Sequence, residues 1–172
     1  MTEATFTLHP SPVGDVLLVQ AGAGLVTAHV LRGQERDLDE QLARLTMALR
    51  TLPGRDDEGF DDARRQLDEY FQSRRTAFDL TLDWQLVHGF SRIALEAACR
   101  IPYGQTAGYG EVAAMAGIPR AARAVGNACA RTPFSVIVPV HRVVRADGSV
   151  GGYGGRAEVK RFLLDLERAA DV

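Results

Sequence analysis

The sequence has few of the residues that build disulfide frameworks, metal clusters or membrane spans. Only two cysteines, Cys99 and Cys129, occur among 172 residues, so neither a disulfide framework nor a four-cysteine zinc site can form. Each lies in an apolar helical pattern, and we expect both to be buried as free thiols. No apolar run approaches the roughly 18 residues of a membrane span, and residues 1–10 lack the basic flank and apolar run of a signal peptide. We therefore expect a cytoplasmic protein that makes no membrane contact.

Charge is divided unevenly along the chain. Residues 1–85 carry 9 basic and 15 acidic side chains, whereas residues 86–172 carry 11 basic and 7 acidic ones. Between Arg100 and Arg145 six arginines face a single acid, Glu111, and such a local excess can offset phosphate repulsion. Arginine outnumbers lysine 19 to 1, but genome composition can produce that bias and it supports no functional inference. The second half is therefore where we expect a partner to bind.

The first half has the pattern of a small sheet with helices. Short apolar runs between turn residues predict an antiparallel meander, and leucines at helical spacing predict two helices. The predicted elements are strands within residues 5–26, helices at 38–49 and 60–71, a loop at 53–58 and a strand at 78–82. Composition changes near Asp83, so we place a domain boundary at about residue 85, between a scaffold domain (1–85) and a second domain (86–172).

The second half begins with a predicted helix from Phe90 to Arg100. Two further helices, from about Tyr109 to Ala116 and from Arg120 to about Arg131, are separated by Gly117, Ile118 and Pro119, which is the helix-turn-helix pattern. Many such pairs are only packed core helices. The second helix, however, has small residues nearly all round with arginines projecting from them. A helix this slender can press its backbone into a narrow groove, so the pattern favours minor-groove contact with DNA.

A distinctive motif follows, with Pro139-Val140-His141-Arg142, a glycine cluster around Tyr153 and a last amphipathic helix. In the pieces IPYGQTAGYGEVA, AARAVGNA, PVHRVV and GYGG, the stretch from Ile101 to Glu167 resembles the O6-alkylguanine-DNA alkyltransferases. Weaker similarity in SPVG, QLDEYF and FDLTLDW extends the resemblance over nearly the whole chain. The resemblance implies an α/β protein. Its N-terminal part would be a small antiparallel sheet with helices, ribonuclease H-like, and its C-terminal part a mainly helical, winged helix-turn-helix-like DNA-binding domain.

The resemblance also assigns the chemistry. In that family the motif is Pro-Cys-His-Arg, and the cysteine irreversibly takes the alkyl group from O6 of a flipped guanine. A thiol is a strong nucleophile only as the thiolate, so a histidine oriented by a carboxylate serves as the base. His141 and Glu167 match these two positions, but Val140 stands at the nucleophile position and has no lone pair. Neither Cys99 nor Cys129 is followed by an activating histidine.

The binding apparatus implied by the resemblance is otherwise present. Tyr109 would crowd the target phosphate and promote base rotation, and Arg123 would fill the vacated space in the duplex. Further DNA-contact positions are Ala121, Ala122, Ala124, Gly126 and Arg142. The pocket for the alkylguanine would comprise Tyr109, the carbonyls of Val140 and Val143, the ring of Tyr153, and the backbone of Gly154 and Gly155. Thr132 stands at a hinge where the family has asparagine, and Gly108 and Gly154 stand where serine is common.

Three functional interpretations follow. The first is a non-catalytic protein that binds duplex DNA containing O6-alkylguanine, flips the base and shields or flags the lesion, with nucleotide excision repair as the candidate downstream pathway. The second is a suicide methyltransferase whose cysteine has been mutated to valine, and the third is a helix-turn-helix regulator that ignores damage. We expect a monomer, associated with the nucleoid if the source is bacterial. No cofactor is implied, and no metal site is expected because His9, His29 and His88 lack cysteine partners in the first half.

Overall fold

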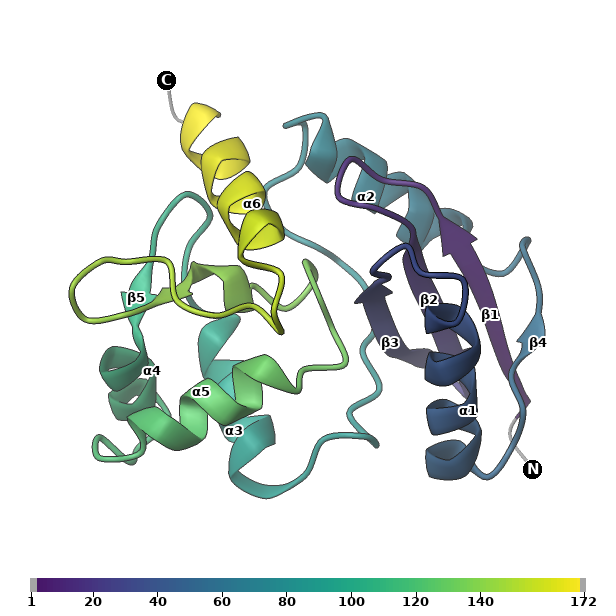
Figure 1. The fold of residues 1–172 in the computed structure, drawn as a ribbon, viewed down its shortest axis with the longest axis horizontal. Helices are drawn as coiled ribbons and strands as arrows, with labels where there is room; N and C mark the ends of the chain where they lie inside the picture. The colour runs from purple at the N-terminus through teal and green to yellow at the C-terminus, as the bar shows by residue number, and fades with distance from the viewer. Residues whose placement is uncertain (1–2, 171–172) are drawn as a thin grey trace. The chain divides into compact units, whose positions relative to one another are not determined.

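The computed structural model describes residues 3–170 as two compact units that divide between Leu86 and Val87 (Figure 1). Unit 1 contains β1 (Ala4–His9), β2 (Val16–Ala21), β3 (Gly24–Val30), α1 (Asp37–Leu49), β4 (Gly54–Arg55) and α2 (Asp61–Phe71). Unit 2 contains α3 (Gly89–Ala98), β5 (Ala107–Gly108), α4 (Tyr109–Met115), α5 (Ala122–Ala130), the 3-10 turn η1 (Val140–Arg142), β6 (Val143–Val144) and α6 (Ala157–Ala169). The expected mixed α/β architecture, with a small N-terminal sheet, is confirmed.

The sheet of unit 1 has the strand order β3-β2-β1-β4. The antiparallel meander β1-β2-β3 is the one that the alternating apolar pattern predicts. The loop prediction for residues 53–58 is partly wrong, because Gly54 and Arg55 form a short parallel strand beside Thr5 and Phe6 of β1. The Asp56 N–H then donates to the Phe6 carbonyl at 3.0 Å. The open edge of β1 explains the pairing, since its backbone groups require partners.

Residues 78–82 form no strand, which corrects the sequence prediction. Leu82 makes only an isolated parallel bridge to Leu25. The reason lies in Gln66, a buried residue of α2 whose side chain binds both backbone groups of Asp79: its amide donates to the Asp79 carbonyl at 2.9 Å and its oxygen accepts from the Asp79 N–H at 2.8 Å. Backbone groups used in this way cannot join a ladder.

The core of unit 1 lies between the sheet and α1. Apolar side chains from all three long strands are buried there. Leu45 of α1 is also buried, and Leu38, Leu42 and Leu49 pack against the same cluster, so the predicted spacing marks the inward face of the helix. Unit 1 thus has a core of its own.

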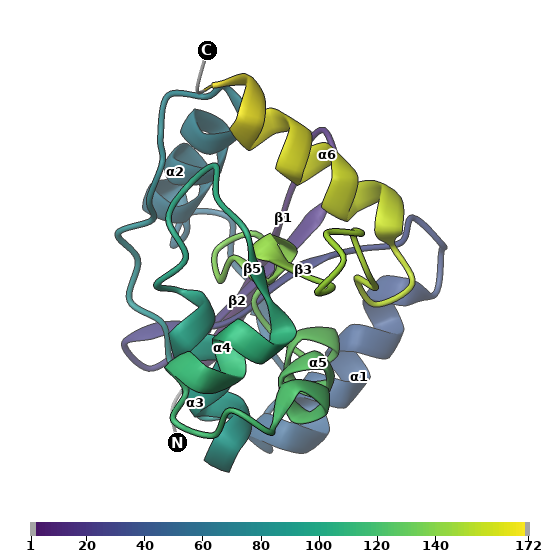
Figure 2. The same ribbon diagram turned by 90° about the vertical axis from the view of Figure 1, so that its left-hand side faces the viewer.

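In unit 2, α3, α4 and α5 pack against one another (Figure 2). Helix α4 ends where Gly117 adopts a left-handed φ of 86°, and the Ile118 N–H returns to the Ala113 carbonyl at 3.0 Å. This is the glycine-terminated helix end that the sequence predicts. The helix-turn-helix pair is therefore present as α4 and α5, each within about two residues of its predicted limits.

The strands β5 and β6 pair in parallel, Ala107 with Val143 and Gly108 with Val144. This pairing holds the start of α4 beside the segment that follows the PVHR motif, and α6 packs against η1. Within residues 3–170, no helix is both long enough and apolar enough to cross a membrane.

Candidate functional site

The PVHR motif forms the short turn η1, and its residues are buried: Val140 is 2% exposed, His141 0% and Arg142 8%. The turn follows Val136, a buried residue whose φ of 69° is left-handed. A β-branched residue in that conformation stores about 1–3 kcal/mol of strain, which the surrounding structure must offset. The side chain at the position of the family nucleophile is therefore enclosed by protein.

Glu167, on the inner face of α6 and 1% exposed, accepts hydrogen bonds from the polar groups in and around this turn. Its Oε1 lies 2.8 Å from His141 Nε2. The Arg142 guanidinium donates to both carboxylate oxygens, at 2.8 Å through Nη2 and 2.9 Å through Nε. The Gly104 N–H donates to Oε2 at 3.3 Å. The pairing of His141 with Glu167, expected from the resemblance, is thus present as part of a larger network.

The network fixes the protonation of the pair. Burial alone would raise the pKa of Glu167, but hydrogen bonds from His141 and Arg142 outweigh it and lower the pKa to about 2. Burial lowers the pKa of His141 below its usual value, although the bond to Glu167 opposes the shift. The imidazole is therefore neutral at pH 7, and because Nε2 donates to an ionised carboxylate, we assign the lone pair to Nδ1. An imidazole in this state can accept a proton, and the adjacent Val140 has none to give.

Arg142, which the sequence analysis assigns to DNA contact, is mostly buried in this structure, and its contact with DNA stays a prediction. Its guanidinium is bound by Glu167, its Nη1 donates to the Ile101 carbonyl at 2.8 Å, and it lies over the Tyr103 ring at 5.6 Å from the centroid. At 8% exposed, the side chain presents little surface to solvent, and Nε, Nη1 and Nη2 each donate to a partner inside the protein. Arg142 joins η1, α6 and the segment that follows α3.

Tyr109, the first residue of α4, has close backbone on two sides. A Cβ atom added at Gly126 of α5 would lie 3.8 Å from its ring, and one added at Gly151 would lie 3.2 Å from its hydroxyl. Gly151 also has a left-handed φ of 74°. The hydroxyl therefore requires a residue without a side chain at position 151, and Tyr109 lies beside the glycine cluster.

Lys160 is a residue of this site that sequence reasoning missed. It lies on α6, is 0% exposed, and its Nζ donates to the Val143 carbonyl at 2.5 Å and to the Gly152 carbonyl at 3.3 Å. The ammonium also lies 5.8 Å from the centroid of the Tyr109 ring. Val143 carries one of the carbonyls expected to accept from the base. The signal available in the sequence was that this is the only lysine of the chain.

The glycine cluster is built on left-handed backbone. Gly148, Gly151, Gly154 and Gly155 all have φ between 56° and 82°. The hydroxyl of Tyr153 is enclosed beside Ser135 and Val136, and burial raises the pKa of Tyr153 to about 12. Gly154 and Gly155 are exposed, and the remaining surface of the Tyr153 side chain is partly open. The loop thus offers backbone to a ligand while its aromatic residue is anchored.

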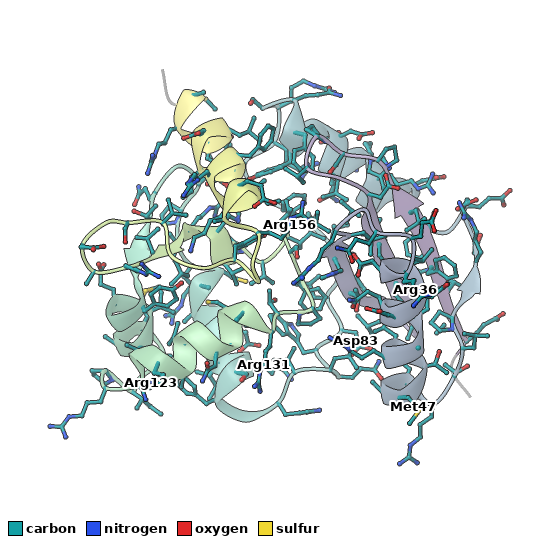
Figure 3. All side chains as sticks on the ribbon, viewed as in Figure 1. Arg36, Met47, Asp83, Arg123, Arg131 and Arg156 are labelled. Atoms are coloured by element: carbon teal, nitrogen blue, oxygen red, sulfur yellow. The ribbon has the colours of Figure 1, made fainter. Side chains whose placement is uncertain are left out.

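Helix α5 carries small residues and arginines outside its buried face. Its buried residues, Val125 and Ala128, face the other helices. Arg123 is exposed, and the small residues Ala121, Ala122, Ala124 and Gly126 are half-buried. Figure 3 shows Arg123 and Arg131 at the two ends of α5. The helix therefore combines a low-profile outer face with cations at its ends.

The remaining candidate residues divide between agreement and correction. Thr132 Oγ1 accepts from the Phe134 N–H at 3.1 Å, so threonine still closes the turn at the hinge position. The expectation that both cysteines are buried is wrong for Cys99, which is exposed, while Cys129 is half-buried. Desolvation raises the pKa of Cys129 to about 11. Within residues 3–170 no three His, Cys, Asp or Glu side chains are placed to hold a metal ion, and His9 pairs with Asp68 at 2.7 Å.

Comparison with known proteins gives a consistent family. Residues 89–169 match the profile of the 6-O-methylguanine DNA methyltransferase DNA-binding domain, and residues 5–84 match that of its ribonuclease-like domain. The methylated-DNA–protein-cysteine methyltransferase of Methanosarcina barkeri is 37% identical over 91% of this chain and 92% of its own, and that of Mycobacterium tuberculosis is 40% identical over 92% and 89%. The crystal structure of the Mycobacterium tuberculosis O6-methylguanine methyltransferase superposes with a TM-score of 0.81 at 35% identity, covering 97% and 94% of the two chains. With both halves matched in order, the chain belongs to the 6-O-methylguanine DNA methyltransferase family.

Proposed function

We propose that this protein binds DNA containing O6-alkylguanine and holds the flipped base in its pocket without transferring the alkyl group. One observation carries the proposal: a buried valine stands directly before a histidine that is neutral and oriented by an ionised glutamate. Alkyl transfer requires a nucleophile that forms a bond to the alkyl carbon as the bond to O6 breaks. A valine side chain has no electron pair with which to form it.

The DNA-binding parts of the site support recognition without chemistry. The outer face of α5 consists of alanine and glycine beside the exposed Arg123, which suits a close approach to the minor groove. We infer that Tyr109 rotates the nucleotide out of the duplex and Arg123 fills the gap. Flipping costs a few kcal/mol, and least for a mispaired base. An alkylated guanine pairs poorly, so damage itself favours occupancy of the pocket.

A protein that is not alkylated is not consumed by its lesion. The complex would persist until the protein dissociates, and would shield the base or mark it for excision repair. A crystal structure of the Mycobacterium tuberculosis relative in complex with DNA, with a TM-score of 0.78 and 36% identity, supports DNA as the partner. We propose a monomer acting in the cytoplasm, at the nucleoid if the source is bacterial, through its C-terminal domain of residues 86–172.

The test is a paired titration at one stated salt concentration, because phosphate contacts make affinity depend strongly on salt. Matched duplexes carrying guanine or O6-methylguanine are titrated by gel shift, and the methyl group is radiolabelled. We expect tighter binding to the methylated duplex and no label on the protein after denaturation. Covalent label on the unmodified chain would overturn the proposal. Equal affinity for both duplexes would favour the regulator that ignores damage.

Arg123→Ala ties recognition to flipping. If Arg123 fills the vacated space, the variant should lose most of its preference for the methylated duplex. Arg36→Ala, an exposed arginine at the start of α1 in unit 1, is the matched control and should keep that preference. A preference unchanged in Arg123→Ala would contradict the assigned role.

A second candidate function is favoured by the same network. The His141–Glu167 pair keeps the geometry and the protonation of an activating base, so the chain is also consistent with a suicide methyltransferase whose cysteine has been replaced by valine. Restoring the cysteine distinguishes an intact catalytic frame from one that has lost further function.

A further inference from the structure

Lys160 combines three features that no other residue shares within the described part of the chain, residues 3–170. It is the only lysine among 20 cationic side chains, it is completely buried, and it donates to two carbonyls of the candidate pocket. Those carbonyls belong to Val143 of β6 and Gly152 of the glycine cluster. The excess of arginine over lysine carries no meaning by itself, but the position of the one lysine does.

The fold does not gain stability from the charge on Lys160. Desolvation, reinforced by the nearby Arg145, lowers the pKa of Lys160 to about 8 from 10.5, although Cys129 opposes the shift. A lowered pKa means that the folded state holds this proton less tightly than the unfolded chain does, so the charge opposes folding at neutral pH. An apolar side chain of similar length would avoid this cost. The ammonium therefore calls for an explanation other than folding.

We propose that Lys160, in its protonated form, is a positioning residue that sets the pocket for an alkylated base. The ammonium lies over the Tyr109 ring and ties the Val143 carbonyl to the Gly152 carbonyl, and the pocket distinguishes the lesion from guanine only while the amine is charged. The inference rests on the proposed function, since it concerns the same pocket.

The contacts explain why charge matters. Hydrogen bonds from an ionised donor are roughly twice as strong as those from a neutral one, and the amine holds a loop whose left-handed glycines flank Gly152 on both sides. Such a segment has many alternative conformations once released. A carbonyl has two lone pairs, so Val143 can accept from Lys160 and still accept from the amino group of a bound base. A neutral amine would also lose its attraction to the Tyr109 ring.

Lys160 is the one member of its surroundings that changes charge between pH 7 and pH 9. The titratable groups near it are Cys129 of α5, His141 of η1, Arg145 after β6 and Tyr109 of α4, whose ring the ammonium faces. Burial raises the pKa of Tyr109 above its usual value and that of Cys129 to about 11, so both stay neutral. The pKa of His141 is lowered, so it is already uncharged, and an arginine stays charged throughout.

The test measures the ratio of affinities for O6-methylguanine and guanine duplexes at pH 7 and pH 9. With a pKa of about 8, a complex that requires the charged amine should lose about tenfold in this ratio over that range, because the charged fraction of the free protein falls by about that factor. Lys160→Met should show a low ratio that does not change with pH. Lys160→Arg keeps its charge at pH 9, so its ratio should be independent of pH. Arg161→Met, the exposed neighbour on α6, should follow the unmodified protein.

A ratio that is constant with pH in the unmodified protein would overturn the inference and leave the proposed function intact. The same tenfold loss in Lys160→Met would also overturn it, because another group would then be responsible. Absence of any lesion preference at pH 7 would sink the proposed function and this inference together. A pH-independent ratio and an absent preference at pH 7 are both measured on the unmodified protein, so the inference can be tested even if a variant fails to fold.

A second measurement uses the uniqueness of the amine. Reductive methylation with formaldehyde and cyanoborohydride, which reduces the imine to the methylamine, can modify only two amines of the protein, Lys160 and the N-terminus, and the two are resolved by mass spectrometry of peptides. If the pocket closes on an alkylated base with the amine charged, the O6-methylguanine duplex should slow modification of Lys160 more than the guanine duplex does. Equal rates with both duplexes at saturation would contradict the positioning role.

Discussion

Glu167→Gln should destabilise this protein strongly, because it removes the one anion of a buried network. Glu167 is 1% exposed and accepts from His141, Arg142 and the Gly104 N–H. Glutamine keeps the shape but leaves the Arg142 guanidinium buried without a counter-charge. Breaking a buried pair in this way costs about 3–5 kcal/mol. The pKa of Glu167, lowered from 4.5 to about 2, corresponds independently to about 3 kcal/mol of stabilisation at neutral pH.

The sign of the pH dependence follows from the direction of that shift. The folded state holds the Glu167 proton less tightly than the unfolded chain, so the stabilisation is fully present above about pH 4.5 and is lost as the pH falls toward 2. The free energy of unfolding of the unmodified protein, measured with urea, should therefore fall as the pH is lowered over this interval. Glu167→Gln should lack that part of the dependence while being less stable at pH 7.

Glu158→Gln is the matched control, because Glu158 is exposed on the same helix and pairs with Arg156 at 2.5 Å. Exposed pairs contribute little, so its urea midpoint at pH 7 should not change measurably. If Glu167→Gln unfolds at the same urea concentration as the unmodified protein, with the same m value, the network around Glu167 does not contribute the stability expected of it. An acid profile identical in the two proteins would refute the charge state of Glu167.

Two further predictions concern the same turn and the hinge before it. Val140→Cys should retain radiolabel from an O6-methylguanine duplex, because His141 is already neutral and oriented to accept the thiol proton. Adding Glu167→Gln should slow that transfer. If Val140→Cys retains no label, other differences from the family, such as Thr132, have also disabled the site. Thr132→Ala should lose about 1 kcal/mol of stability in urea unfolding, because the Phe134 N–H loses its acceptor, whereas Thr132→Ser should keep most of it, and equal losses in the two variants would assign the effect to packing.

Local patterns predicted the elements whose partners lie nearby in the chain. The strand meander and the helix that ends at Gly117 follow from alternation, helical spacing and a glycine that can adopt a left-handed φ. The strand predicted at residues 78–82 failed because a tertiary contact overrode propensity: Gln66, 13 residues earlier, binds the backbone of Asp79. Propensity cannot anticipate a side chain that arrives from another element.

The site shows the same division. Val140, His141 and Glu167 were found from the motif and its resemblance, and the structure joins the latter two across 26 residues. The resemblance placed Arg142 among the DNA-contact positions, and the structure shows its guanidinium bound by Glu167 and by the Ile101 carbonyl, 41 residues away. Lys160 was missed because its partner carbonyl lies 17 residues earlier. Every residue has a backbone carbonyl, so a sequence does not indicate which one will accept a hydrogen bond.

The sequence by itself determined that position 140 carries no nucleophile, since atoms that a side chain lacks cannot be supplied by folding. It also determined the basic second half, the slender helix and the single lysine. Only the tertiary structure decided which polar groups are buried together, and hence their charge states at neutral pH. Glu167 is ionised, His141 is neutral, and Lys160 has a pKa of about 8. The physical reason is that pKa and hydrogen bonding depend on distance through space and on exclusion of water, and neither is a function of separation along the chain.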